Sequence, residues 1–335
     1  MSLEYDPSIN EFRNRPGVET RVPNFGSTKA FGHKNPNKSD WCLGKLKDAL
    51  GKMGYRDEDT MYGAPYDLRY APPVPGLTSK VYFDYFKQFM ELVETATKKK
   101  NKKAIILGHS FGGKVALEFV RNTPMAWRKK YIKHLILVAP TLSEGFMQPV
   151  SNIATGSEIL PIPTTTLLST RPLWRSFEIA LMNFPSPIVY GHRPLVITKQ
   201  RNYSAYEMDD FLTAIGLDEG VQPFKRRAIP HMRYYKAPMV PMTSINGVGN
   251  ETPLQIIYWD GDFDVSPGAV YGDGDGHINL IGMLAFDKEM RRQPSQNNMF
   301  KSVKINKAQH ATIVTDDFAL ERVIQEILEA DQNSS

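Results

Sequence analysis

A serine between two glycines, at the point where an apolar strand pattern gives way to a helical one, constrains this chain more than any other feature. Residues 104–107 read Ala-Ile-Ile-Leu, residues 108–112 read Gly-His-Ser-Phe-Gly, and apolar side chains then repeat at helical spacing over residues 115–120. A serine on such a sharp turn has a strained backbone, and glycines are needed where side chains would collide with the strand or the helix. The bare pattern can arise by chance in a turn, but this context indicates a nucleophile at Ser110.

A nucleophilic serine needs a histidine as its base, and behind this kind of turn the chain order is serine, acid, histidine. Five of the seven histidines precede the serine, lie within or close behind its turn, or fall where strand signals are missing: His33, His109, His134, His192 and His231. We expect His109, inside the turn, to point away from the site. His277 and His310 remain, and His310 follows a short strand pattern at 302–305 and precedes an amphipathic helix at 319–328. We therefore predict His310 as the base.

The acid has two candidate clusters. Asp260, Asp262 and Asp264 follow a buried strand predicted over 254–259, whereas residues 272–276 read Gly-Asp-Gly-Asp-Gly. The pattern alone slightly favours the first cluster. Aspartates flanked by glycine also occur in calcium loops, but the second cluster lacks the later glutamate of an EF-hand loop and the first has no helix before it. A metal site is therefore the weaker interpretation.

Five blocks of sequence, in the same order, resemble the lecithin:cholesterol acyltransferase family. They are residues 17–26 (GVETRVPNFG), 63–69 (GAPYDLR), the turn around Ser110, 126–132 (AWRKKYI) and 271–276 (YGDGDG). The resemblance runs from about residue 17 to about residue 328. Residues 202–209 (NYSAYEMD) make the chain most similar to the plant lecithin:cholesterol acyltransferase-like 1 branch.

The resemblance implies an α/β-hydrolase fold with a cap insertion and an acyl-transfer activity. In the family, Ser110 would take a fatty acyl chain from a phospholipid and pass it to a sterol, another alcohol or water. The second aspartate of the Gly-Asp-Gly-Asp-Gly run is the family's acid, so Asp275 replaces Asp260 as the predicted acid and His310 stays the base. The backbone N–H of Phe111 would donate one hydrogen bond to the oxyanion. No cofactor and no metal is implied.

The family also implies a segment before residue 17 with the first strands, an oxyanion loop and a lid. No counterpart is evident here, and only residues 18–22 read as a strand ahead of the turn. We therefore expect the N-terminal strands and the lid to be missing. Relatives usually carry Trp-Gly-Gly where this chain has residues 141–143 (Thr-Leu-Ser), and Thr-Val where it has His277-Ile278.

Length and composition predict one catalytic core with an insertion. We place the hydrolase core at residues 15–140 and 254–330, and the cap at residues 141–253, which are rich in proline and aromatic side chains. A helix at 207–215 presents one apolar face, which either covers an acyl channel or, as the default, packs on the core. Apolar residues at helical spacing over 82–93 are expected to be core.

Charge and targeting signals limit the classes of partner that this chain is expected to bind. The net charge is +5, and a lysine-rich run at 98–103 is either a solvated loop or a weak contact to a membrane surface. No nucleic-acid motif accompanies it, no stretch reaches 18 apolar residues, and the single cysteine, Cys42, excludes an internal disulfide. We therefore expect a phospholipid, a sterol or other alcohol acceptor and peripheral membrane contact, without nucleic acid. The compartment stays open: cytoplasm or membrane surface if Met1 is the true start, the secretory pathway if a longer form exists.

Three classes of function remain open from sequence. The first is an acyltransferase or phospholipase A that works through Ser110, Asp275 and His310. The second is a carboxylesterase for small esters, and the third is a catalytically silent relative that binds lipid. The acyl acceptor cannot be named from sequence, because transfer and hydrolysis differ only in which nucleophile reaches the acyl-enzyme.

Overall fold

A parallel sheet forms the centre of the molecule. The computed structural model describes residues 2–31, 43–157 and 166–332, and within them four strands pair in the order β10-β7-β4-β3. They are β3 (Ala104–His109), β4 (Ile132–Val138), β7 (Met242–Val248) and β10 (Phe300–Asn306). In this part of the chain β3, the strand that leads to Ser110, lies at the edge of the sheet.

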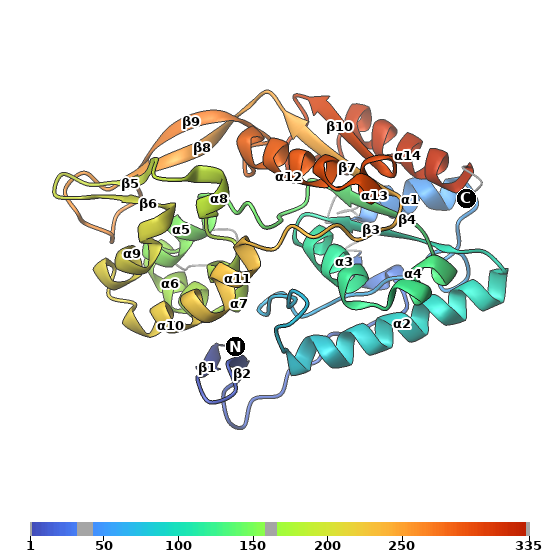
Figure 1. Cartoon of the computed structure of the whole chain (residues 1–335), viewed down its shortest axis with the longest axis horizontal. Coiled ribbons are helices and arrows are strands. Elements are labelled where there is room, and N and C mark those ends of the chain that lie inside the picture. The colour runs from blue at the N-terminus through green and yellow to red at the C-terminus, as the bar shows by residue number, and fades with distance from the viewer. Residues whose placement is uncertain (1, 32–42, 158–165, 333–335) are drawn as a thin grey trace.

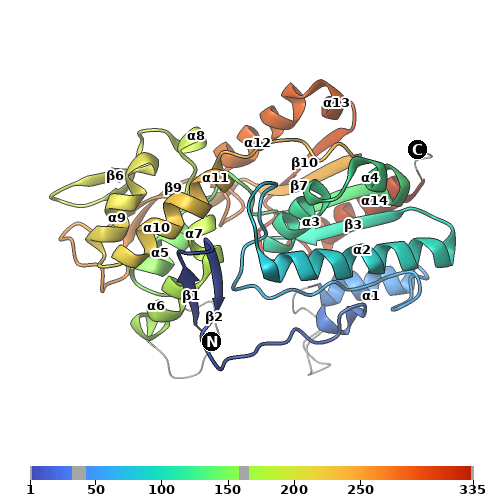
Figure 2. The same ribbon diagram turned by 60° about the horizontal axis from the view of Figure 1, so that its bottom comes forward.

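Helices cover both faces of this sheet (Figures 1 and 2). On one side lie α2 (Lys80–Lys100), α3 (Phe111–Asn122), α4 (Met125–Tyr131) and α12 (Leu280–Arg292), with the short α13 (Pro294–Asn297) following α12. On the other side lie α1 (Gly44–Lys52) and α14 (Asp317–Gln332).

Strand β4 shows why the layers form. Leu135 and Leu137 pack with the α3 side, whereas Ile136 and Val138 pack with the α14 side, and all four are fully buried. A parallel strand between two helical layers is apolar on both faces, so it reads as a continuous apolar run. The predicted α/β architecture is confirmed.

A second, smaller body stands beside the core, at the left in Figure 1. Its sheet has the order β6-β5-β8-β9, with β5 (Pro194–Ile197), β6 (Asn202–Ser204), β8 (Asn250–Ile257) and β9 (Gly268–Gly274). Its short helices are α5 (Gln148–Ala154), α6 (Leu167–Ser176), α7 (Glu178–Met182), α8 (Pro187–Tyr190), α9 (Met208–Ala214), α10 (Val221–Pro223) and α11 (Ile229–Met232). In α9, Met208, Phe211 and Leu212 are fully buried, so this predicted helix packs rather than standing free.

The strand pairing differs from the predicted division into a 254–330 core segment and a 141–253 cap. Strand β7 belongs to the core sheet, between β4 and β10, while β8 and β9 pair with the strands of the cap. The polar residues Thr243, Ser244 and Asn246 are buried in β7, and they hid this strand from a search for apolar runs. We propose that the cap begins near residue 141 as predicted, that the chain returns to the core near residue 241 to form β7, and that β8 and β9 belong to the cap.

The predicted strand at residues 18–22 is wrong. These residues lie outside the strands, and Val18 and Val22 are exposed, because their alternating pattern has no partner strand to pair with. Instead β1 (Leu3–Asp6) and β2 (Glu11–Asn14) form an antiparallel pair with each other. In Figures 1 and 2 this hairpin lies beside the helices of the second body.

A buried ion pair ties the N-terminal hairpin to that body. The Arg227 guanidinium pairs with Glu178, and its Nη1 donates to the carbonyl oxygens of Asn10 and Thr78 at 2.7 and 3.0 Å. The second Glu178 oxygen accepts from the backbone N–H of Ala71 at 3.0 Å. Both charged side chains are about 1% exposed, so neither charge can turn to solvent if its partner is removed.

We therefore expect Arg227→Met to lower the free energy of unfolding by about 3–5 kcal/mol, because it leaves the Glu178 charge buried without its partner. Adding Glu178→Gln should restore most of the loss, since glutamine is neutral and can still accept from Ala71. Urea denaturation of both variants measures the difference. A single variant as stable as the parent chain would contradict this account of the hairpin's anchorage.

Candidate active site

The backbone of Ser110 is held in a strained conformation at the end of β3. Its φ and ψ are 54° and −126°, a region that residues with a side chain rarely adopt. Its N–H donates to Val138 O at 2.9 Å, and its carbonyl oxygen accepts from the N–H groups of Gly113 and Thr141 at 2.9 and 3.2 Å. These contacts fix the turn from both sides. The strand, turn and helix predicted around Ser110 are confirmed.

Close packing at this turn requires glycine at Gly108 and Gly113, and only Gly108 belongs to the Gly-x-Ser-x-Gly motif. A Cβ on Gly108 would lie 2.2 Å from the carbonyl oxygen of Gly112, and a Cβ on Gly113 would lie 2.6 Å from Cβ of Pro140. A Cβ on Gly112 would meet only the Tyr66 hydroxyl, at an ordinary 3.5 Å. The collision expected at Gly112 is therefore absent, and Gly113, outside the motif, is the second glycine that close packing requires.

This difference predicts opposite effects of two neighbouring substitutions in α3. Gly113→Ala should lower the free energy of unfolding by about 1–3 kcal/mol, because the Pro140 backbone must move. Gly112→Ala should be neutral or stabilising by up to ~1 kcal/mol, because alanine favours the helix. Urea denaturation compares the two, and a Gly112→Ala variant that is the less stable one would contradict the packing described here.

The three residues predicted for catalysis lie in one hydrogen-bonded chain. Ser110 Oγ lies 2.8 Å from His310 Nε2, and His310 Nδ1 lies 2.9 Å from Asp275 Oδ2. They come from the turn after β3, the loop after β10 and the loop after β9. Because a carboxylate only accepts, Nδ1 carries the imidazole proton and Nε2 is left to accept from the serine hydroxyl.

Asp275 is oriented by its own loop. Its side chain is fully buried, and Oδ1 accepts from the N–H groups of His277 and Ile278 at 3.0 and 2.6 Å. The His310 N–H also donates to Asp275 O at 2.8 Å, so the two loops are joined through the backbone. Asp260, the alternative acid, is exposed and lines a surface hollow with Arg201. The geometry therefore favours Asp275 over Asp260.

Two further histidines lie beside His310: His109, which was expected to point away, and His277, the other candidate for the base. His109 does not point away: its Nε2 donates to His310 O at 2.9 Å, and the two rings lie 5.9 Å apart. The His277 ring stacks on His310 with centroids 4.8 Å apart. Burial, followed by the charge on His310, lowers the pKa of both His109 and His277 to about 4. Their places inside the serine turn and directly after the acid's loop were the available signals.

Phe111 is the first residue of α3, and its ring packs against Tyr66 at 5.7 Å. The first N–H groups of a helix have no acceptor within the helix, and they carry the positive end of its dipole. The N–H of Phe111 lies at this end of the helix, directly after Ser110, and its role as an oxyanion donor stays a prediction.

Comparison with known proteins identifies the family. The family model for lecithin:cholesterol acyltransferase matches residues 1–214. The chain belongs to the lecithin:cholesterol acyltransferase family. It is 38% identical to lecithin-cholesterol acyltransferase-like 1 of Oryza sativa subsp. japonica over 98% of this chain and 73% of that protein, and 37% identical to the Arabidopsis thaliana protein of that name over 98% and 74%. The predicted resemblance is confirmed.

More distant matches carry other names. The chain is 26% identical to the lysosomal phospholipase A and acyltransferase of Rattus norvegicus over 88% of its own length and 69% of that protein's. Among solved structures, a monoglyceride lipase from Saccharomyces cerevisiae matches with a TM-score of 0.43 and 14% identity, over 88% of this chain and 82% of that one.

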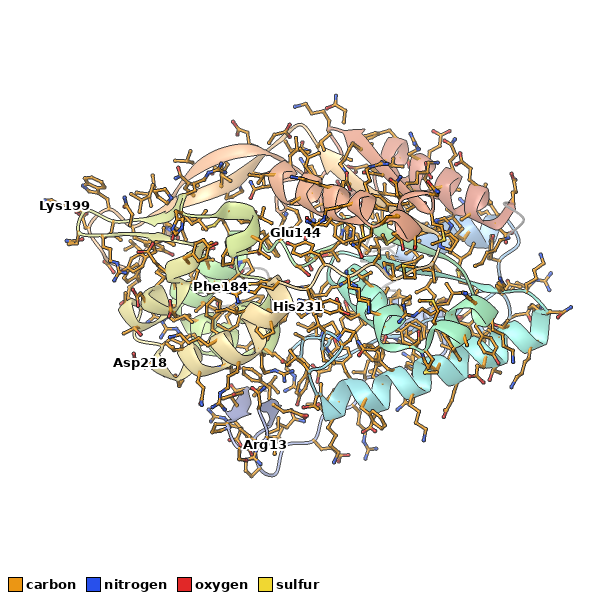
Figure 3. All side chains as sticks on the ribbon, viewed as in Figure 1. Arg13, Glu144, Phe184, Lys199, Asp218 and His231 are labelled. Atoms are coloured by element: carbon orange, nitrogen blue, oxygen red, sulfur yellow. The ribbon has the colours of Figure 1, made fainter. Side chains whose placement is uncertain are left out.

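In this family member, the helix behind the serine turn presents buried charge to the cap. Lys114, Glu118 and Arg121 lie on one face of α3 and are at most 5% exposed. Burial lowers the pKa of Lys114 to about 8 and raises that of Glu144, on the loop after β4, to about 7. Figure 3 shows Glu144 and His231 at the junction of the two bodies. The cap therefore contacts the helix of the serine turn through polar as well as apolar groups.

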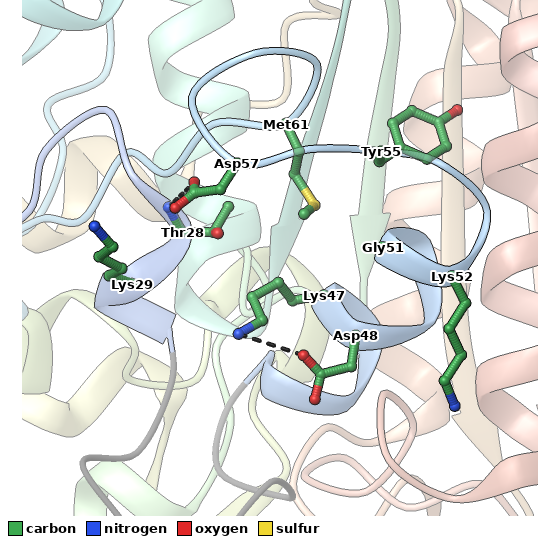
Figure 4. Close-up of a pocket in the computed structure, with 9 residues that line it drawn as sticks. All are labelled: Thr28, Lys29, Lys47, Asp48, Gly51, Lys52, Tyr55, Asp57 and Met61. Carbon is green, nitrogen blue, oxygen red and sulfur yellow. Dashed lines mark hydrogen bonds and ion pairs between the residues drawn. The ribbon is translucent and has the colours of Figure 1, made fainter. Parts of the chain in front are cut away.

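A surface hollow lies on the other side of the core (Figure 4). It is lined by Thr28, Lys29, Lys47, Asp48, Gly51, Lys52, Tyr55, Asp57 and Met61. Within it Lys47 pairs with Asp48 at 3.3 Å, and Asp57 accepts from the N–H of Thr28 at 2.7 Å. None of the three predicted catalytic residues lines it, so its charges are separate from the chemistry at Ser110.

Over the described ranges 2–31, 43–157 and 166–332, no helix combines the length and the apolar character needed to cross a bilayer.

Proposed function

We propose that this chain is a serine-dependent lipid acyltransferase. It takes a fatty acyl group from a phospholipid onto Ser110 and passes it to a sterol or another alcohol. The hydrogen-bonded chain from Ser110 through His310 to Asp275, in a member of this family, carries the proposal. Transfer of the same acyl group to water, a phospholipase A reaction, is the second candidate, and the similarity to the lysosomal phospholipase A and acyltransferase favours it.

The first half of the reaction acylates the serine. His310 Nε2 accepts the hydroxyl proton of Ser110 while Oγ attacks the ester carbonyl of the phospholipid. The carbonyl oxygen becomes negative and accepts a hydrogen bond from the N–H of Phe111. His310 then returns the proton to the departing oxygen, so a lysophospholipid leaves and an acyl ester remains on Ser110.

The second half repeats these steps with a new nucleophile. The hydroxyl of an alcohol, or water, gives its proton to His310 and attacks the acyl ester, and His310 then protonates Ser110 Oγ. Asp275 accepts from Nδ1 throughout, which fixes the imidazole tautomer and stabilises its positive form. Whether an alcohol or water attacks depends on which reaches the ester, and this decides between transferase and phospholipase.

The test is a product analysis. Purified chain is mixed with phosphatidylcholine vesicles that carry a labelled acyl group, alone, with cholesterol, or with a long-chain primary alcohol. We expect labelled acyl esters that require both an alcohol and Ser110. Labelled free fatty acid alone would establish the phospholipase instead.

Two other outcomes would overturn the proposal. Cleavage of a short-chain nitrophenyl ester without release of acyl groups from phospholipid would indicate a carboxylesterase. Vesicle binding with neither reaction would indicate a catalytically silent lipid-binding relative. Ser110→Ala serves as the control in every arm.

A further inference from the structure

His277 touches two members of the proposed catalytic chain at once. Its ring lies over the face of the His310 imidazole, with centroids 4.8 Å apart and planes inclined by 30°. Its backbone N–H donates to Asp275 Oδ1 at 3.0 Å. Asp275 Oδ2 also accepts from His310 Nδ1. The loop that carries Asp275 and His277 therefore contacts the His310 ring on its face, through His277, and at its edge, through Asp275.

His310 is held from the other direction by its backbone. Its N–H donates to Asp275 O at 2.8 Å, and its carbonyl oxygen accepts from His109 Nε2 at 2.9 Å. These contacts fix the main chain but leave rotation of the ring to be limited by its neighbours. The His277 ring stacks on one face of the His310 ring, so it opposes rotation of the imidazole out of the line between Ser110 and Asp275.

The His277 ring is uncharged at neutral pH, which allows it to stack on the His310 ring. The titratable groups that face it are His310 and Asp275, and His109 lies beyond His310. Burial first, and then the charge on His310, lower the pKa of His277 to about 4. At neutral pH the stacked ring is therefore uncharged, and it does not repel the positive imidazolium that forms when His310 takes the serine proton.

We propose that His277 is a positioning residue for His310, which holds the imidazole in line and places an aromatic face over the imidazolium. The proposal rests on the function proposed above. An aromatic face over a cation favours it by an amount equivalent to about a three- to thirtyfold change in rate.

The test compares His277→Ala with His277→Phe. Phenylalanine keeps an aromatic ring over His310, whereas alanine uncovers it. The matched control is His192→Ala, because His192 also stacks on an aromatic ring, that of Tyr206, at 4.5 Å, and is not part of the site. The rate of Ser110 labelling by a fluorophosphonate is measured from pH 4 to 9, with the thermal midpoint of each variant.

We expect His277→Ala to label about three- to thirtyfold more slowly, and His277→Phe and His192→Ala to stay within about twofold of the parent chain. A His277→Ala variant with an unchanged labelling rate would overturn the proposal. So would a folded His277→Phe variant as impaired as His277→Ala, because the imidazole nitrogens rather than the ring face would then be required.

Labelling requires no phospholipid, so a failure of the proposed lipid reaction leaves this test readable. An arm without any reaction uses the NMR signals of labelled histidine. The His310 ring-proton shift should change in His277→Ala but not in His277→Phe. An unchanged His310 signal in His277→Ala would overturn the stacking itself.

Discussion

Replacing Ser110 by alanine is expected to lower acyl release from a phospholipid by at least about 10⁴-fold, because the atom that becomes acylated is removed. The fold should persist. The Ser110 side chain makes one hydrogen bond, to His310, and the turn is held by backbone contacts that alanine keeps. A change of no more than ~1 kcal/mol in the free energy of unfolding follows from the loss of that bond.

Both quantities are measured on the same preparation, by release of labelled fatty acyl groups and by urea denaturation. Ser151→Ala in α5 is the matched control, because it removes a hydroxyl that donates to the carbonyl oxygen of Gln148, away from the three predicted catalytic residues. A Ser110→Ala enzyme that keeps more than about a hundredth of the parent activity would place the nucleophile elsewhere.

Asp275→Asn is expected to lower kcat by about 10⁴-fold. An amide that presents its NH₂ group to His310 Nδ1 requires the imidazole to carry its proton on Nε2, where it can no longer accept from Ser110. Asparagine Oδ1 can still accept from His277 and Ile278, so the loop should stay folded. Steady-state turnover of a phospholipid, with thermal unfolding as the check on structure, measures the effect.

Asp260→Asn is the control for this prediction. Asp260 follows a strand and is flanked by glycine, which is why the sequence pattern alone slightly favoured its cluster. In the structure it lies in the exposed hollow with Arg201. Its replacement should change kcat by less than about threefold, since surface substitutions of this kind usually cost little. The reverse order of the two aspartates would refute the acid assignment.

The serine turn was predictable because the residues that determine a strained turn lie close together in the sequence. Strand, glycine and helix signals lie within seventeen residues of one another, from Ala104 to Val120, and the structure has β3 and α3 there. The choice of His310 needed only chain order and a neighbouring strand. The choice of Asp275 needed the family resemblance, because two glycine-flanked aspartate clusters follow adjacent strands and the sequence pattern alone slightly favoured the other cluster.

Other features depend on contacts between distant segments. His277 and His310 are 33 positions apart, and nothing local marks their stacking. The requirement for Gly113 comes from Pro140 on the next strand's loop. Strand β7 carries polar residues that are buried between its two neighbouring strands. Residues 18–22 alternate like a strand but pair with no strand in the described part of the chain. In each case tertiary contact, rather than the local pattern, decides the outcome.

The most direct test of the account is to look for the acyl group on Ser110. The purified chain is mixed briefly with a phosphatidylcholine of defined acyl composition, quenched in acid, digested and analysed by mass spectrometry, with Ser110→Ala treated in parallel. We predict a peptide containing Ser110 that carries the mass of one acyl group and disappears when an alcohol acceptor is added. Release of acyl groups from the phospholipid with the acyl mass on another residue, or on none, would contradict it.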